Sequence, residues 1–148
     1  MTDQPQTEVT RLGVTAEEFD TFVNLPENAD KLFELIGGRI VEVMPTNIRS
    51  SQIAGMIITF INMYLLNNPI GYTTTTDGGY MVAGERYIPD VAYISKAKMP
   101  KLPVGGGYYH LPPDLAVEVL SPGNTSDEVR RKVAGYLAAG VLTWVFDP

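Results

Sequence analysis

The 148-residue chain contains no cysteine, and His110 is its single histidine. Disulfides and thiolate metal sites are therefore excluded. Zinc fits this composition poorly, and a histidine that stands alone in a segment rich in proline and glycine is interpreted as incidental. The absence of cysteine is compatible with a reducing compartment, so we expect a cytoplasmic protein.

Long apolar runs are also missing. One stretch, residues 53–66, suggests a membrane span at first sight, but it is shorter than the ~20 residues a span needs and contains Asn62. Its apolar residues recur at helical spacing and its other faces are also fairly apolar, which predicts a buried helix covered on several sides. The N-terminus has no basic segment followed by an apolar run, so we expect no secretory signal and no membrane partner.

Positive charge is in deficit, because eleven Lys and Arg residues face seventeen Asp and Glu residues and the net charge is −6. A protein that binds nucleic acid without sequence preference usually presents a basic surface, since phosphate neutralisation supplies much of the affinity. A nucleic-acid enzyme can still be acidic when carboxylates gather at a metal site, where bound cations invert the local field. The charge therefore weakens the case for a DNA substrate without excluding one.

Helical and strand patterns alternate along the chain. They comprise capping boxes at residues 15–18 and 125–128, a hairpin around Gly37-Gly38, a helix from Ser50, and short strands at 71–94, 114–120 and 141–146. This order predicts an α/β (mixed α+β) fold in which a mixed sheet is flanked by helices. The length fits one domain, residues 14–148, after a flexible lead-in at residues 1–13.

Between two of the strands, residues 96–113 are rich in Lys, Pro and Gly. Such a segment predicts a long mobile loop, and long loops in compact domains are often functional. Its glycines and the Tyr108-Tyr109 pair would either close over a bound strand or serve only as a connection and its packing.

Two acids stand in strand-like apolar surroundings. Glu118 interrupts the apolar run 115–120, and Asp90 follows Pro89 in the run 88–94. An ionised carboxylate in a buried strand costs several kcal/mol unless it is paired or binds a metal. The alternatives are a solvent-facing glutamate at a sheet edge and an ordinary Pro-Asp turn. Two carboxylates that converge from neighbouring strands would offer hard oxygen ligands suited to Mg²⁺ or Mn²⁺.

Lys132 lies on the helix that follows Glu118. The buried stripe of this helix is predicted to consist of apolar residues at helical spacing, Val129, Val133, Tyr136 and Leu137. Lys132 is beside that stripe, so its aliphatic stem could follow the apolar face and bring the ammonium group to the strand ends. A solvated lysine is the alternative, and it is the commoner case for a lysine taken alone.

Five segments, in this order, resemble the Uma2 family of bacterial proteins: residues 33–41 (FELIGGRIV), 89–93 (PDVAY), 113–122 (PDLAVEVLSP), 132–136 (KVAGY) and 144–148 (WVFDP). The family is assigned to the restriction-endonuclease-like PD-(D/E)XK superfamily. The resemblance covers the chain after Val14. It implies a restriction-endonuclease-like core with an N-terminal helix and a β-hairpin.

The resemblance also implies a site. Asp90 and Glu118 match the two acids of the motif, and they are expected to hold Mg²⁺ or Mn²⁺. The lysine usually found two residues after the second acid is absent, since Leu120 stands there, and Lys132 matches the lysine that family members place on the following helix. Glu34 matches a glutamate that assists the metal.

One departure concerns the start of the second helix, where many members carry a histidine and this chain has Ser51. The departure bears on any activity that relies on that histidine.

The implied activity is that of a metal-dependent endonuclease that hydrolyses phosphodiester bonds of DNA, with Lys132 orienting or activating the attacking water. One alternative is a binding or assembly module that kept the fold and lost its turnover, a reading that the negative charge fits. The other is a metal-dependent hydrolase of a different phosphate ester. A homodimer is expected by analogy, because two cuts across a duplex need two sites.

Overall fold

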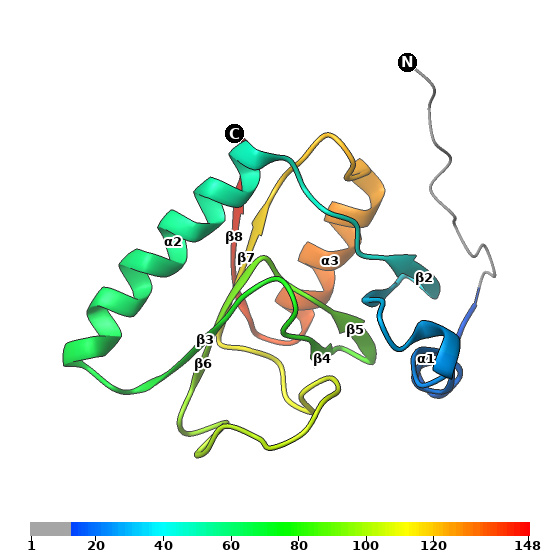
Figure 1. The fold of residues 1–148 in the computed structure, drawn as a ribbon, viewed down its shortest axis with the longest axis horizontal. Coiled ribbons are helices and arrows are strands. Elements are labelled where there is room, and N and C mark those ends of the chain that lie inside the picture. The colour runs from blue at the N-terminus through cyan, green and yellow to red at the C-terminus, as the bar shows by residue number, and fades with distance from the viewer. Residues whose placement is uncertain (1–12) are drawn as a thin grey trace.

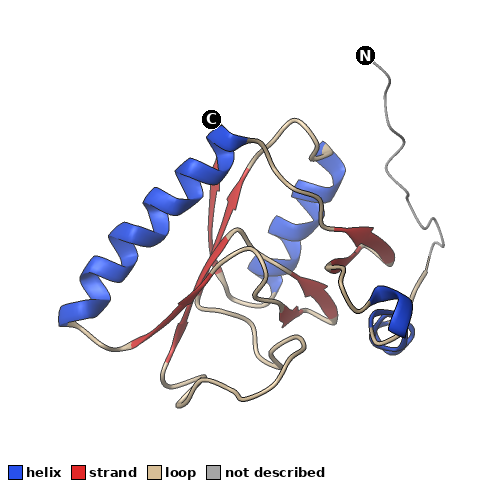
Figure 2. Ribbon diagram, in the orientation of Figure 1, coloured by secondary structure: helices blue, strands red, loops and turns tan. Residues whose placement is uncertain are grey.

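The computed structural model describes residues 13–148, so the predicted lead-in lies, apart from Gly13, outside the described residues. The helices are α1 (Ala16–Val23), the short 3-10 helix η1 (Pro26–Asn28), α2 (Ile48–Asn67) and α3 (Ser126–Ala138). The strands are β1 (Phe33–Ile36), β2 (Arg39–Glu42), β3 (Gly71–Thr74), β4 (Tyr80–Val82), β5 (Glu85–Tyr87), β6 (Val91–Ser95), β7 (Leu115–Val119) and β8 (Leu142–Phe146) (Figures 1 and 2).

The described strands form two four-stranded sheets, in the orders β2-β1-β5-β4 and β3-β6-β7-β8. The first sheet is antiparallel, and the second is mixed because β7 pairs with β6 antiparallel and with β8 parallel. The predicted α/β class, with a mixed sheet flanked by helices, is confirmed. The strand region expected around Asp90 is divided into β5 and β6, since residues 88–90 leave the ladder at Pro89 and carry the chain from one sheet to the other.

Helix α2 lies along one face of the second sheet (Figure 1). Ala54 on this helix packs with Val91 and Val117 of the strands beneath it. The rest of the helix is more open than its composition suggests, and its large exposed side chains are Ile48, Met56, Phe60, Met63, Tyr64 and Leu66. The expectation of a helix covered on several sides was wrong, because within the described structure only its sheet-facing side has a partner. Among residues 13–148 no helix combines the length and the apolar character that crossing a bilayer requires.

The predicted hairpin is confirmed, and it places Glu34 inside the molecule. Gly37 and Gly38 both have positive φ, +59° and +74°, as a two-residue type I′ turn requires. The turn pairs Ile36 with Arg39, and all four residues of β1 are buried.

Helix α3 approaches the first sheet closely at Gly135. A Cβ at this position would lie 2.8 Å from Cε2 of Tyr87 and would also collide with the Tyr87 hydroxyl. Tyr87 is buried and its ring contacts that of Tyr136 edge to face, so it has little room to move. The absence of a side chain at Gly135 therefore allows α3 to pack closely against β5.

Gly135→Ala should lower the free energy of unfolding by about 1–3 kcal/mol, because the clash with Tyr87 outweighs the roughly 1 kcal/mol that alanine contributes to a helix interior. Gly55→Ala is the matched control: Gly55 is also helical, and a Cβ there meets nothing within 4 Å. Urea denaturation should show Gly55→Ala to be more stable than the parent and Gly135→Ala less stable. Equal gains at both positions would mean that α3 is not held close to β5 by the glycine.

The segment 96–113 has no helix or strand of its own, as expected, but hydrogen bonds from its two tyrosines hold part of it in place. The Tyr109 hydroxyl donates to the Lys98 carbonyl at 2.7 Å, and the Tyr108 hydroxyl donates to the carbonyl of Phe33. Tyr108 also contacts Phe19 edge to face. The tyrosine pair therefore serves the packing of this connection, which was one of its two expected roles.

Candidate functional site

Strand alternation turns Glu118 toward α3. The neighbouring Val117 and Val119 pack against α2, whereas Ala116 belongs to the core that contains Tyr136 of α3. Glu118 shares the face of Ala116, since side chains two residues apart on a strand point the same way. All of β7 is buried, so the predicted burial of Glu118 is confirmed.

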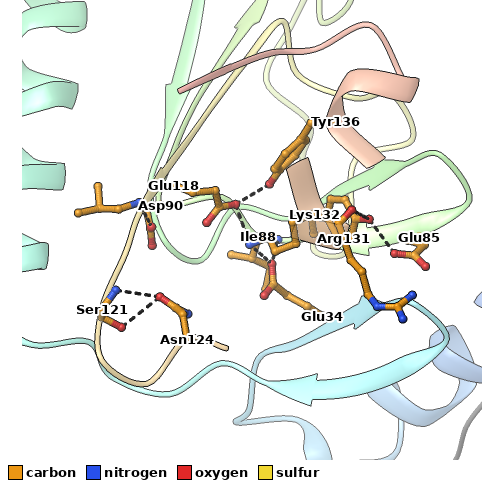
Figure 3. Close-up of polar contacts among 12 residues, drawn as sticks. Glu34, Glu85, Ile88, Asp90, Glu118, Ser121, Asn124, Arg131, Lys132 and Tyr136 are labelled. Carbon is orange, nitrogen blue, oxygen red and sulfur yellow. Dashed lines mark hydrogen bonds and ion pairs between the residues drawn. The ribbon is translucent and has the colours of Figure 1, made fainter. Parts of the chain in front are cut away.

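Lys132 is buried between two carboxylates. Its Nζ lies 2.7 Å from Oε1 of Glu34 and 2.7 Å from Oε1 of Glu118 (Figure 3). Three elements supply these groups: β1 of the first sheet, β7 of the second and α3. The ammonium group therefore joins the two sheets, and the solvated-lysine alternative does not apply.

The buried face of α3 differs from the predicted apolar stripe. Its buried residues are Lys132 and Tyr136, four positions apart, whereas Leu137 is 62 % exposed. The prediction was wrong on Leu137 because the inner side of the helix faces two acids, and a cation satisfies them where an apolar side chain cannot.

Two tyrosines complete the surroundings of the lysine. The Tyr136 hydroxyl donates to Oε1 of Glu118 at 2.8 Å, and the Lys132 ammonium lies 5.9 Å from the centre of the Tyr87 ring. The Tyr87 hydroxyl donates to Oε2 of Glu85 at 2.7 Å. Sequence reasoning missed the polar role of Tyr136, although its spacing of four residues from Lys132 was a usable signal.

Glu34 has a second partner besides the lysine. Its Oε1 also accepts the backbone N–H of Ile88 at 2.7 Å, in the segment that connects the two sheets. Glu34 therefore fixes both the ammonium group and the start of the segment that carries Asp90.

Asp90 lies at the bend just before β6, half-buried, and not inside a strand as predicted. Its Oδ2 accepts the backbone N–H of Val119 at 2.6 Å, which holds it against the end of β7. Among the described residues no ion pair joins Asp90 to Lys132. The structure thus brings Glu34, Glu118 and Lys132 into direct contact and places Asp90 beside them (Figure 3).

Burial dominates the electrostatics of this cluster. It raises the pKa of Glu118 to about 7, because removal from water and the nearby Glu34 and Asp90 charges outweigh the attraction of Lys132. Burial also raises the pKa of Asp90. For Lys132 burial acts in the lowering direction, but the Glu118 and Glu34 carboxylates outweigh it and hold its pKa above the ordinary value.

These shifts predict a pH-dependent stability that Glu118→Gln removes. The pKa of Glu118 rises on folding from 4.5 to about 7, so the native state binds an extra proton between these values. The group's contribution is therefore complete below pH 4.5 and is lost as the pH rises through about 7, by up to about 3 kcal/mol. Urea unfolding from pH 4 to pH 8 should show the parent losing stability relative to Glu118→Gln. Glu27→Gln, which removes an exposed acid, should run parallel to the parent. Parallel curves for parent and Glu118→Gln would contradict the shift.

A cavity of about 590 Å³ opens beside Asp90, between α2 and the strand ends. Ser50 and Ser51 of α2 both line it. Ser50 is the buried one of the pair, and its hydroxyl donates to the Leu120 carbonyl at 2.8 Å. Ser51, at the expected histidine position, is exposed. Sequence reasoning treated Ser50 only as the start of a helix and missed that its side chain ties the start of α2 to the end of β7.

The site has the donors for a magnesium-like ion but no large ligand cluster. Within residues 13–148 no group of three or more His, Cys, Asp or Glu residues could hold a metal. The hydrogen bonds between described residues leave Oδ1 of Asp90 and Oε2 of Glu118 unused, and neither atom is buried without a partner. Mg²⁺ commonly keeps several waters and takes only one or two protein carboxylates, so the two acids fit such an ion.

A family model described as "Putative restriction endonuclease", Uma2, matches residues 19–148. The chain belongs to the Uma2 family. Among solved structures, this Uma2 chain is similar to a crystal structure from Anabaena variabilis, described as "a putative nuclease belonging to DUF820", with a TM-score of 0.72 and 23 % identity. The match covers 89 % of this chain and 73 % of that one, and at this identity it shows a shared fold. The search of curated proteins found no match.

Proposed function

We propose that this chain is a divalent-cation-dependent endonuclease that hydrolyses phosphodiester bonds of DNA. The observation that supports it most is the buried Lys132 held at 2.7 Å from both Glu34 and Glu118. Burying three ionisable groups is costly, and apolar residues in their place would often be equally or more stable. A reactive centre supplies a reason to keep them. The family's description, "Putative restriction endonuclease", agrees with this chemistry.

Asp90 and Glu118 would hold the cation through the oxygens that the protein leaves unused. When bound, a divalent cation polarises the phosphate and lowers the pKa of a coordinated water. The raised pKa of Glu118 means that its carboxyl group becomes fully available as a ligand only above about pH 7. Cation affinity should therefore increase as the pH rises through that value.

Lys132 would act as a fixed positive charge near the reacting phosphate. Its raised pKa keeps it protonated at neutral pH, so it can orient a water or stabilise negative charge but cannot accept the proton of the water. Glu34 would be a positioning residue, since it holds Lys132 and the Ile88 amide together.

The test is a pair of measurements on the intact chain. Calorimetric titration with Mn²⁺ and Mg²⁺ should show binding, and each ion should support cleavage of supercoiled, linear duplex or single-stranded DNA that EDTA abolishes. Cation binding with hydrolysis of a simple aryl phosphate but of no DNA would indicate the other phosphate-ester hydrolase. If the chain shows neither cation binding nor cleavage, the binding or assembly module is the remaining function.

A further inference from the structure

A second cavity, of about 610 Å³, lies on the other side of Ser50, where α2 and α3 begin. Ser50 lines both this cavity and the one that contains Asp90, so the two adjoin. The Asp90 cavity has no Lys or Arg among its lining residues, whereas Arg49 and Arg130 line the second one. The two cavities therefore carry opposite charge at adjoining positions.

Both arginines are exposed, and among the described residues a carboxylate does not hold either of them at ion-pair distance. By contrast, Arg86 is paired with Asp20 and Arg131 with Asp127. One bond of Arg130, from Nε to the Ser126 carbonyl at 3.2 Å, leaves its terminal nitrogens available. Two guanidinium groups that can reach a ligand thus lie at this cavity.

Neutral donors and one acid share the wall. Ser121, Asn124, Thr125 and Ser126 line the cavity with hydroxyl and amide groups. Both helix starts are capped by their own side chains, as the Asn47 amide oxygen accepts the Ser50 N–H and the Thr125 hydroxyl accepts the Glu128 N–H, so the attraction for an anion comes mainly from the guanidinium groups. Asp147 also lines the cavity and should oppose an anion there.

We propose that this second cavity binds one backbone phosphate of a nucleic-acid strand. The neighbouring phosphate of the same strand would lie in the Asp90 cavity. Planar guanidinium groups suit phosphate oxygens, which they can bind through two parallel hydrogen bonds. One cavity suits a cation-bound phosphate, and the adjoining cavity suits a phosphate without a cation. Such a pair fits a nucleic-acid strand, because phosphates recur along its backbone. That the strand passes Ser50 from one cavity to the other rests on the proposed endonuclease function. That the arginines bind a phosphate does not depend on that function.

The experiment measures binding apart from cleavage. A fluorescein-labelled single-stranded oligodeoxynucleotide is titrated with protein in EDTA at low salt and followed by anisotropy. Arg49→Gln with Arg130→Gln should weaken binding about tenfold and flatten the dependence of log K on log salt by about 1.4, near 0.7 for each lost phosphate contact. Lys31→Gln with Lys101→Gln is the matched control, because it removes two exposed cations that do not line the cavity. It should change binding less than twofold.

Asp147→Asn is expected to change the affinity for the oligodeoxynucleotide in the opposite direction. It removes the acid from the cavity wall and should tighten binding about threefold. Circular dichroism melts of all variants, whose substitutions are at the surface, should match that of the parent.

The outcomes separate this inference from the proposed function. Parent-like binding by the double arginine variant, or an equal loss in the lysine control, would overturn the subsite even if cleavage occurs. Competition by inorganic phosphate as effective as that by unlabelled oligonucleotide would overturn the backbone assignment in favour of a small phosphate ligand. Arginine-dependent binding with no cleavage under any condition would support the subsite while the endonuclease proposal fails. If cleavage occurs, the double arginine variant should raise KM and leave kcat nearly unchanged.

Discussion

Asp90→Asn should lower the rate of DNA cleavage by about 10³-fold or more while leaving the protein folded. The substitution replaces a charged oxygen available to a cation by an uncharged amide, and loss of several kcal/mol of charge stabilisation corresponds to a rate change of this order. The amide oxygen can still accept the Val119 N–H, so the contact between the bend and β7 is retained. Burial raises the pKa of Asp90 and thus disfavours its charged form. At pH 8 the variant's Tm should therefore equal or exceed that of the parent.

Calorimetry and cleavage must be measured together to interpret this variant. Mn²⁺ affinity should fall in parallel with turnover, and Asp30→Asn, which removes an exposed acid, should change neither. Full cleavage by Asp90→Asn would exclude this carboxylate from the mechanism. Lost cleavage with unchanged Mn²⁺ affinity would give it a role other than holding the cation.

Lys132→Met should cost both stability and turnover. Methionine retains an unbranched apolar stem, but two buried carboxylates then face each other without a cation, and breaking a buried pair in this way costs about 3–5 kcal/mol. The penalty should be largest at pH 8 and should shrink at pH 5, because protonation of Glu118 relieves the repulsion. Loss of the positive charge should lower turnover by about 10²–10³-fold, the typical effect of removing one group that stabilises transition-state charge.

The control for Lys132→Met is Arg131→Met, the adjacent residue on α3. Arg131 is exposed and pairs within the helix with Asp127 at 2.8 Å, so its loss should change the Tm little. Mn²⁺ should partly restore the Tm of Lys132→Met, since a cation held by Asp90 and Glu118 also offsets the buried charge. A variant as stable and as active as the parent would remove Lys132 from both the mechanism and the core.

Local rules predicted the elements well because each depends on a few adjacent residues. Gly37-Gly38 determines the hairpin, and the two capping boxes determine the starts of α1 and α3. The sequence also indicated that Glu118 is buried, because apolar residues flank it on both sides.

Local rules could not predict which element packs against each face of a helix. The second helix is apolar on several sides, yet among residues 13–148 the sheet beneath it covers only one of them, and no pattern within the helix distinguishes that side from the others. The same limit affected α3, where Tyr136 of the expected apolar stripe is buried, but the residue buried beside it is Lys132, while Leu137 is exposed. Burial of Lys132 depends on Glu34 and Glu118, which lie distant in sequence, and on the close approach at Gly135.

The ammonium group joins the two sheets, so the proposed catalysis and the stability of the fold depend on the same atoms. Any event that draws Glu118 away from Lys132 also loosens the junction between the two halves of the molecule. A laboratory search for thermostable variants should therefore enrich variants in which apolar residues replace Glu34, Glu118 and Lys132 together, with a higher Tm and no cleavage activity. The increase in Tm of such variants would measure how much stability the protein loses by keeping these ionisable groups at the junction.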